Sequence, residues 1–250
     1  MGRVDTAVIL AAGMGRRLGA LAGDLPKGLV PLGGEALVER SLRALRARGV
    51  GRIVLVAGYR AEAYYQLARA WREVEVIENK EFATTESMAS LACALEVVDG
   101  DFLLLESDLF YEPRALDAVL EHGAPDVVLA SDPTGATDEV WVEAEAGRVR
   151  NLSKDPRSLG AVSGEFVGIL RVSWPLAELL RGAYGVFQRE HGHGRMAYET
   201  GALVAVAARH PVGLCLVPDL LWGELDDEGH LRRLREEVWP AFERGARGRG

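Results

Sequence analysis

Residues Thr6–Gly19 read TAVILAAGMGRRLG, and the interpretation of the chain starts from them. The apolar run Thr6–Leu10 is typical of a strand buried on both faces, because a strand with one solvent-exposed face alternates apolar and polar residues. Two closely spaced glycines follow, which let backbone amides approach a polyphosphate, and Arg16 or Arg17 can add charge-assisted hydrogen bonds. The stretch predicts a phosphate-binding loop, with an ordinary glycine turn as the alternative.

Apolar strands and amphipathic helices alternate along the rest of the first half. This pattern predicts a largely parallel sheet with helices on both faces, an α/β fold of Rossmann-like type. We expect strands at residues 52–56, 74–77, 101–106 and 126–130, and helices at 35–48, 61–71, 87–95 and 113–121.

The pattern changes after about residue 131. Val140–Ala144 and Arg148–Leu152 predict an antiparallel hairpin, because a short turn separates two strand-like runs. The second half is therefore expected to form a mixed-sheet extension or lid over the first. It should contain further strands at 166–171 and 214–218, helices near 175–180, 198–208 and 229–244, and a flexible tail at 244–250.

Composition narrows the classes of protein. The 250 residues are 48% hydrophobic and 26% charged, as in ordinary globular proteins, and the net charge of −8 argues against nucleic acid as a partner. Because no apolar run approaches the roughly 18 residues of a membrane span, we expect a cytoplasmic protein without membrane insertion. The two cysteines form no CxxC motif, so neither a zinc site nor a disulfide framework is predicted.

A second motif, DLPKGLVPLGG at Asp24–Gly34, contains two prolines that are expected to hold Lys27 on an extended, rigid loop. A strand followed by LAAGxGxRLG and then by PKxLxPLxG resembles the nucleotidyltransferases that join a nucleoside triphosphate to a phosphorylated acceptor. The resemblance implies the nucleotide-diphospho-sugar transferase fold in one domain, 1–243, with a nucleotide-binding half (1–130) and an acceptor-binding half (131–243). It implies that Arg16 contacts the triphosphate and that Lys27 lies near the reacting phosphates. The loop residues implied to bind the nucleotide are Leu10, Ala11, Ala12, Gly13 and Gly15.

Two acidic segments resemble the metal-binding motifs of the same family. LLLESDLFYEP resembles its apolar strand ending in a metal-binding aspartate, here Asp108, and LWGELDDEGHL resembles its late W-x-E-x-D segment, here Glu224 and Asp226. Carboxylates from distant parts of the chain suit Mg²⁺, a hard cation that prefers oxygen ligands. Asp227 is the competing ligand, and an acidic first turn of a helix is the alternative explanation of this run.

The segment ENKEFATTESMASLACAL at Glu78–Leu95 narrows the resemblance to the phosphocholine and aminoethylphosphonate cytidylyltransferases. It implies that Thr85, Ser87 and Ser90 lie near the nucleoside, although Glu86 and Ser87 stand where that branch usually has two asparagines. The runs DEVWV, NLSKD and SGEFVGIL resemble the same branch. The resemblance therefore implies transfer of CMP from CTP to an amino- or ammonium-bearing phosphate or phosphonate.

Candidate acceptor-binding residues come from the second half. Lys154 follows a predicted hairpin strand and can point at the acceptor's phosphorus oxygens, unless it is a surface turn lysine. Aromatic faces combined with a carboxylate bind ammonium groups, although single aromatic residues are more often part of a core. The residues considered for this pocket are Glu165, Trp141, Tyr198, Glu199 and Trp222.

Other interpretations stay open. The nearest alternative keeps the reaction but takes a sugar-1-phosphate or an inositol phosphate as acceptor, with UTP, dTTP, GTP or CTP as the nucleotide. A more remote alternative is a non-catalytic nucleotide-binding regulator. A dehydrogenase is disfavoured because Leu18 occupies the place of the third glycine of the dinucleotide-binding motif. His191 and His193 are interpreted as part of a mobile loop rather than as metal ligands. A homodimer is neither predicted nor excluded.

Overall fold

The computed structural model describes residues 4–15, 17–18 and 25–247. Its first half consists of β1 (Thr6–Ala11), the short 3-10 turn η2 (Lys27–Leu29), β2 (Pro31–Leu32), β3 (Glu35–Ala36), α1 (Leu37–Ala47), β4 (Arg52–Ala57), α2 (Ala61–Ala68), β5 (Val74–Glu78), α3 (Ser87–Ala94), β6 (Phe102–Glu106), β7 (Leu109–Tyr111), α4 (Arg114–Glu121) and β8 (Val127–Ser131). Its second half consists of β9 (Trp141–Glu145), β10 (Arg148–Ser153), the turn η3 (Pro156–Ser158), β11 (Val162–Val172), α5 (Trp174–His191), the π-helical η4 (Tyr198–Leu203), α6 (Val204–Ala207), β12 (Gly213–Leu216), β13 (Trp222–Glu224), α7 (Glu228–Arg233), the π-helical η5 (Leu234–Val238) and α8 (Trp239–Arg247).

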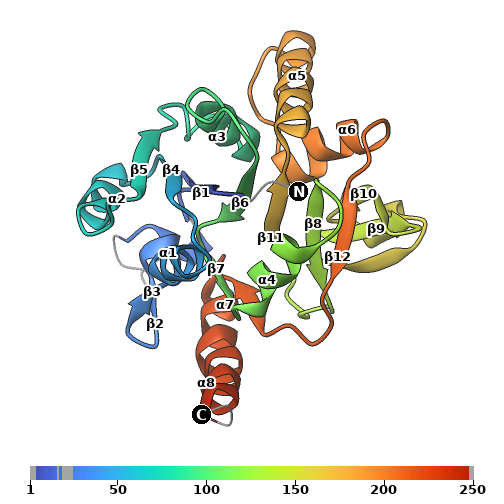
Figure 1. Cartoon of the computed structure of the whole chain (residues 1–250). Helices are drawn as coiled ribbons and strands as arrows, with labels where there is room; N and C mark the ends of the chain where they lie inside the picture. The colour runs from blue at the N-terminus through green and yellow to red at the C-terminus, as the bar shows by residue number, and fades with distance from the viewer. Residues whose placement is uncertain (1–3, 16, 19–24, 248–250) are drawn as a thin grey trace.

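The main sheet has the strand order β5-β4-β1-β6-β11-β8-β12-β10-β9. Strands β5, β4, β1 and β6 are parallel, as the alternating pattern predicts. The largely parallel sheet expected through residues 126–130 is wrong beyond β6, because β11 inserts antiparallel between β6 and β8. The fold is therefore a mixed α/β sheet flanked by helices (Figure 1).

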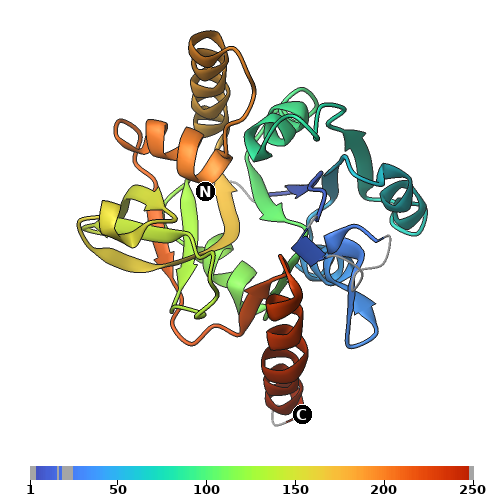
Figure 2. The same cartoon turned by 180° about the vertical axis from the view of Figure 1, so that it is seen from behind.

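Strand β11 also explains why the strands of the second half form a closed series of pairings. Residues 162–165 pair with β9, whereas residues 169–172 pair with β6, and the register to β8 shifts between Phe166 and Leu170. Gly168 lies within that shift and has a φ of 82°, which glycine adopts without a steric penalty. Strands β11, β8, β12, β10 and β9 consequently form a closed series of pairings, seen beside the parallel strands in Figure 2.

Two hydrophobic cores lie on opposite faces of the sheet because side chains alternate along each strand. In β1, Val8 packs in the core under α3 and α5, whereas Ala7 and Ile9 pack in the core under α1, α2 and α4. The hairpin predicted at 140–152 is present as β9 and β10. Helices thus cover both faces of the parallel strands, as the sequence predicts.

Two local expectations need correction. Helix α5 is longer than predicted: Ser173 Oγ accepts the Leu176 N–H at its start, and Gly192, with a φ of 70°, ends it. His191 is therefore the last helical residue, with its ring stacked on Phe187 at 4.2 Å, and is not part of a loop. The closing helix is divided into α7, η5 and α8 and continues to Arg247, so residues 244–247 are helical and residues 248–250 lie outside the described part.

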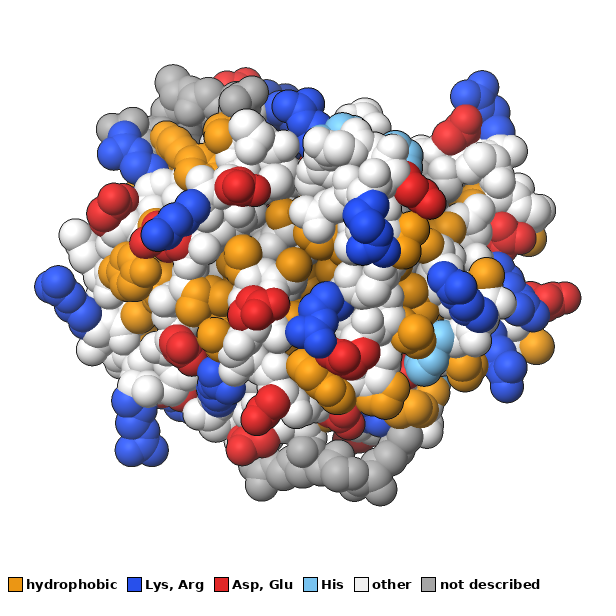
Figure 3. Space-filling view, turned by 90° about the horizontal axis from the view of Figure 1, so that it is seen from above, with side chains coloured by type: hydrophobic (Ala, Val, Ile, Leu, Met, Phe, Trp, Pro, Cys, Tyr) orange, Lys and Arg blue, Asp and Glu red, His pale blue; other side chains and the backbone are white. Residues whose placement is uncertain are grey.

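Two further observations concern the surface charge and the length of the apolar helices. On the face shown in Figure 3, basic and acidic side chains are interspersed rather than gathered into one basic patch. Within the described ranges, no helix combines the length and the apolar character that crossing a membrane requires.

Candidate active site

A cleft of about 660 Å³ lies between the two halves of the molecule, at the carboxyl ends of β1 and β6. Ligands of open α/β sheets bind at this edge, because loops from several strands meet there. The sequence-predicted residues that line the cleft are Leu10, Ala11, Ala12, Gly13, Lys27, Thr85, Ser87, Ser90, Asp108, Lys154, Glu165, Glu199, Trp222, Glu224 and Asp226.

Lys27 lies at the centre of the cleft, beside two carboxylates. It begins the turn η2, so the predicted extended loop is wrong at this point. The turn packs tightly because the next residue is glycine: a Cβ on Gly28 would lie 2.9 Å from the Ser107 carbonyl oxygen. Lys27 Nζ is 3.2 Å from Asp108 Oδ2 and also contacts Asp226. Burial lowers the pKa of the ammonium, but the charges of Asp108 and Asp226 outweigh it and raise that pKa, so Lys27 is charged.

Asp226 and its neighbour Asp227 have different surroundings. Asp227 is the N-cap of α7, where its Oδ1 accepts the His230 N–H at 3.0 Å, and it does not line the cleft. The helix-start explanation of this acidic run therefore applies to Asp227. Burial raises the pKa of Asp226, but the hydrogen bond from Glu224 and the charge of Lys27 outweigh it and hold that pKa well below its ordinary value. Glu224 is the opposite case, because burial and the hydrogen bond to Asp226 raise its pKa well above the ordinary value.

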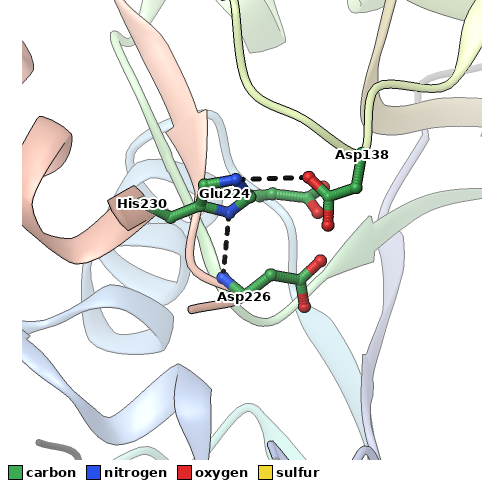
Figure 4. A group of neighbouring side chains, drawn as sticks. All are labelled: Asp138, Glu224, Asp226 and His230. Carbon is green, nitrogen blue, oxygen red and sulfur yellow. Dashed lines mark hydrogen bonds and ion pairs between the residues drawn. The ribbon is translucent and has the colours of Figure 1, made fainter. Parts of the chain in front are cut away.

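Three further residues complete this cluster. Arg17, which the sequence indicated only as a possible phosphate contact, has Nη1 2.9 Å from Asp138 Oδ2 and Nη2 2.8 Å from Asp226 Oδ2. His230 is buried between the same two aspartates: its Nδ1 accepts the Asp226 backbone N–H at 3.2 Å, and its Nε2 lies 3.2 Å from Asp138 Oδ1 (Figure 4). Asp138 and His230 lie in the runs DEVWV and LWGELDDEGHL, but neither was predicted as a site residue, because the contacts of Asp138 with Arg17 and with His230 join residues far apart in sequence.

The carboxylates fit a divalent cation, and His230 does not. Asp138, Glu224, Asp226 and His230 each offer an atom within 4.8 Å of the others. However, His230 Nδ1 accepts a backbone hydrogen, so the proton of the neutral ring is on Nε2, which then has no lone pair for a metal. Oxygen ligands suit Mg²⁺, and the convergence of Asp108 and Asp226 on one cationic group shows that the site accommodates positive charge.

One wall of the cleft is a polar platform formed by the segment after β5. Asn79 is buried, and its Nδ2 donates to Thr85 Oγ1 and to Ser90 Oγ, both at 3.1 Å. Its Oδ1 accepts the Glu81 N–H at 3.0 Å. Asn79 thereby orders a segment in which the predicted nucleoside-binding hydroxyls are brought together.

Two buried glutamates also line the cleft. Glu165 is 3% exposed, and its two oxygens accept the Thr134 N–H at 2.5 Å and the Thr134 hydroxyl at 2.9 Å. Burial raises the pKa of Glu165 to about 7. Glu199 accepts from Ser87 Oγ at 3.3 Å, and burial raises its pKa as well. Lys154 is exposed and lines the same cleft.

The remaining predicted residues lie elsewhere. Tyr198 is fully buried and does not line the cleft, but its hydroxyl donates to Glu106 Oε1 at 2.8 Å. Glu106 does line the cleft, and burial together with the charges of nearby acids raises its pKa to about 8. Trp141 pairs with Glu165 in the β9–β11 register and is not a lining residue. Gly15 has a φ of 57° and packs beside Lys27 outside the cleft lining, and Arg16 lies outside the described residues.

The chain is similar in sequence to proteins of known activity. The chain is 31% identical over 237 residues to the CMP-5'-(3-aminopropyl)phosphonate synthase of Streptomyces rubellomurinus, covering 91% of this chain and 38% of that protein. It is 34% identical over 115 residues to the 2-aminoethylphosphonate cytidylyltransferase of Lancefieldella rimae, covering 43% of this chain and 47% of that protein. The chain therefore spans less than half the length of either relative.

Solved structures show the same fold. The inositol-1-phosphate CTP transferase from T. maritima superposes with a TM-score of 0.79 at 21% identity, covering 97% of this chain and 96% of that one. A family model, the MobA-like NTP transferase domain, matches residues 7–236. That match extends over both halves of the molecule and over the whole cleft, and the chain therefore belongs to the family of MobA-like NTP transferase domains.

Proposed function

We propose that this chain transfers CMP from CTP to a phosphonate or phosphate that carries an amino or ammonium group, and releases pyrophosphate. One observation carries the proposal: a single cleft holds a lysine paired with two aspartates at its centre and buried glutamates at one end. The relative that matches 91% of this chain is named for making a CMP-aminopropylphosphonate, which supports the same substrate class.

The reaction needs no general base. An oxygen of a phosphonate or phosphate is already anionic near neutral pH, so it can attack the α-phosphorus of CTP directly. A bond forms between that oxygen and the α-phosphorus, and the bond from the α-phosphorus to the oxygen bridging to the β-phosphorus breaks. The electron pair of the broken bond leaves with pyrophosphate. Catalysis then consists of aligning the two substrates and neutralising the negative charge of the transition state.

The positive charge comes from residues on both sides of the cleft. Lys27 is held charged at the centre, and Lys154 lies at the acceptor end, where its ammonium can approach the acceptor's phosphorus oxygens. Arg16 is proposed to contact the triphosphate. Asp108 and Asp226, with Glu224 beside them, would hold Mg²⁺, which supplies further positive charge to phosphate oxygens when it is bound.

The glutamates give the acceptor end its selectivity. Glu165 and Glu199 are buried carboxyl groups that line the same cleft as Trp222, and a carboxylate with an aromatic face attracts an ammonium group. A sugar or inositol phosphate presents only neutral hydroxyls and gains nothing from a negative charge there. The arrangement therefore favours an aminoalkyl acceptor.

The test crosses CTP, UTP, ATP and GTP with a panel of acceptors and measures pyrophosphate release in the presence of Mg²⁺. The panel holds phosphocholine, aminoethylphosphonate, aminopropylphosphonate, an alkylphosphonate without an amino group, inositol-1-phosphate and glucose-1-phosphate. Turnover with CTP and the amino-bearing acceptors alone is the expected result. Turnover with a sugar or inositol phosphate instead would contradict the assignment of the glutamates, and CTP binding without any turnover would indicate a nucleotide-binding regulator.

A further inference from the structure

The loop between β8 and β9 forms one wall of the cleft but has little packing behind it. Residues Thr134, Ala136, Asp138, Glu139 and Val140 line the cleft. A second hollow of about 480 Å³ adjoins the loop, lined in part by residues 135–137 and 227–230. Because the loop borders both hollows and none of residues 132–140 is buried, core packing does not set the position of the middle of the loop.

Polar contacts hold the loop instead. At its start, Asp132 Oδ2 accepts the Asp219 N–H at 2.9 Å, and at its end the Val140 carbonyl accepts the Phe166 N–H at 2.8 Å. Between these ends, Asp138 has one oxygen beside Arg17 and the other beside His230. Arg17 comes from the glycine loop after β1 and His230 from α7, so Asp138 ties the wall to both neighbouring elements.

The same loop connects Asp138 to the acceptor end of the cleft. Thr134, four residues before Asp138, donates its backbone N–H and its hydroxyl to the two oxygens of Glu165. A displaced loop would withdraw both donors from a buried carboxyl group. A buried carboxyl group left without its hydrogen bonds is destabilised, so the orientation of Glu165 depends on the position of the loop.

We propose that Asp138 is a positioning residue for the acceptor: held by Arg17 and His230, it fixes the 132–140 loop and, through Thr134, the carboxyl group of Glu165. This inference rests on the proposed function for the nature of the acceptor. The position of the loop itself is independent of the substrate. In this account Asp108, Asp226 and Glu224 hold the metal and Asp138 holds the loop, so removing Asp138 should act on the acceptor and not on the metal or the nucleotide.

The kinetic test uses Asp138→Ala, with Thr134→Ala and the double variant. Asp138→Ala should raise the KM for the aminoalkyl phosphonate about tenfold, which corresponds to about 1.4 kcal/mol, while the KM for CTP changes less than about twofold. The double variant should be no worse than the worse single variant, because both act through Glu165. Asp117→Ala, which removes the surface partner of Arg48 on α4, is the matched control and should change neither constant.

A second arm measures amide hydrogen exchange of residues 132–140 in the substrate-free protein. Asp138→Ala should speed exchange at Thr134 while the strands β1 and β6 keep their protection, which also shows that the variant is folded. Unchanged exchange at Thr134 would overturn the proposal. An equal rise in both KM values, or a loss of Mn²⁺ affinity measured by electron paramagnetic resonance without nucleotide, would overturn it too, because Asp138 would then act on the metal or the nucleotide. If the wild type turned over no acceptor, the proposed function would fail, whereas the exchange arm would still decide the role of the loop.

Discussion

Two carboxyl groups of the cleft, Asp226 and Glu165, have pKa values shifted in opposite directions. At the centre, Lys27 and Arg17 surround Asp226, and its pKa lies well below the ordinary value. At the proposed acceptor end, burial raises the pKa of Glu165 to about 7 and also raises that of Glu199. Asp226 is thus a permanent anion matched by cations, whereas Glu165 is partly protonated until a cation arrives.

This difference assigns the two regions to different ligands. A site that is permanently charged suits a metal ion and the phosphates that accompany it, which are present in every catalytic cycle. A site whose carboxyl groups titrate near neutral pH gains charge when an ammonium group binds, because the ammonium favours the ionised form. Substitutions and the pH dependence test the two regions separately.

The largest effect is expected at the centre. Asp108→Asn removes a carboxylate that contacts Lys27 and is proposed to hold Mg²⁺, and it should lower kcat about a thousandfold while the fold is retained. Pyrophosphate release measures the activity, and thermal unfolding checks the fold. Near-normal turnover in a folded Asp108→Asn variant would remove Asp108 from the metal site.

The adjacent residues Asp226 and Asp227 provide a second test at the centre of the cleft. Asp226→Asn should lower kcat by a factor of about a hundred or more, because the variant loses the charge that pairs with Lys27 and Arg17. Asp227→Asn should stay within about twofold of the wild type, because asparagine is as good an N-cap as aspartate for α7. The reverse order of the two effects would mean that Asp227 is the functional ligand.

The pH dependence tests the acceptor end. Glu165 is proposed to bind the ammonium as a carboxylate, so the KM for an aminoalkyl phosphonate should fall as the pH rises through about 7 and level off above it. About one carboxyl group in ten is ionised one pH unit below the pKa, so the KM at pH 6 should be about ten times that at pH 8. The ratio to the KM of an alkylphosphonate without an amino group removes the titration of the phosphonate itself. Glu165→Gln should abolish this dependence, and a dependence that persisted would assign it to another group.

The smallest effect is expected beneath the cleft. Tyr198→Phe removes the hydroxyl that donates to Glu106, a hydrogen bond that lowers the pKa of this carboxyl group. The variant should therefore raise the pKa of Glu106 above about 8 and change the KM for the acceptor and for CTP by less than about threefold. Carbon-13 NMR of labelled glutamate follows the titration. A loss of CTP binding would instead place Glu106 at the nucleotide end.

The sequence predicted the local elements of the first half well. The apolar run before the glycine loop is β1, and the helix predicted at 35–48 is α1 at Leu37–Ala47, because burial and helical periodicity depend on neighbouring residues. The position of β11 was not predicted, since its pattern shows that it is buried but not which strands it pairs with. Its bend at Gly168 is visible only once the pairing partners are known.

The candidate site was predicted where a motif marks it. Lys27, Asp108 and Asp226 do converge, although they are up to 199 residues apart. Asp138 and His230 were missed although they lie in runs that resemble the family, because the contacts of Asp138 with Arg17 and with His230 join residues far apart in sequence. Tyr198 was assigned to the acceptor pocket itself, whereas its buried ring reaches the cleft only through Glu106.

The most direct measurement is phosphorus-31 NMR of a reaction containing CTP, Mg²⁺ and aminoethylphosphonate or aminopropylphosphonate. The account predicts two coupled resonances, one from the phosphonate and one from the cytidylyl phosphorus, that appear together with one equivalent of pyrophosphate. CTP that stayed unchanged, or that gave CMP and pyrophosphate without the coupled pair, would contradict transfer to the acceptor.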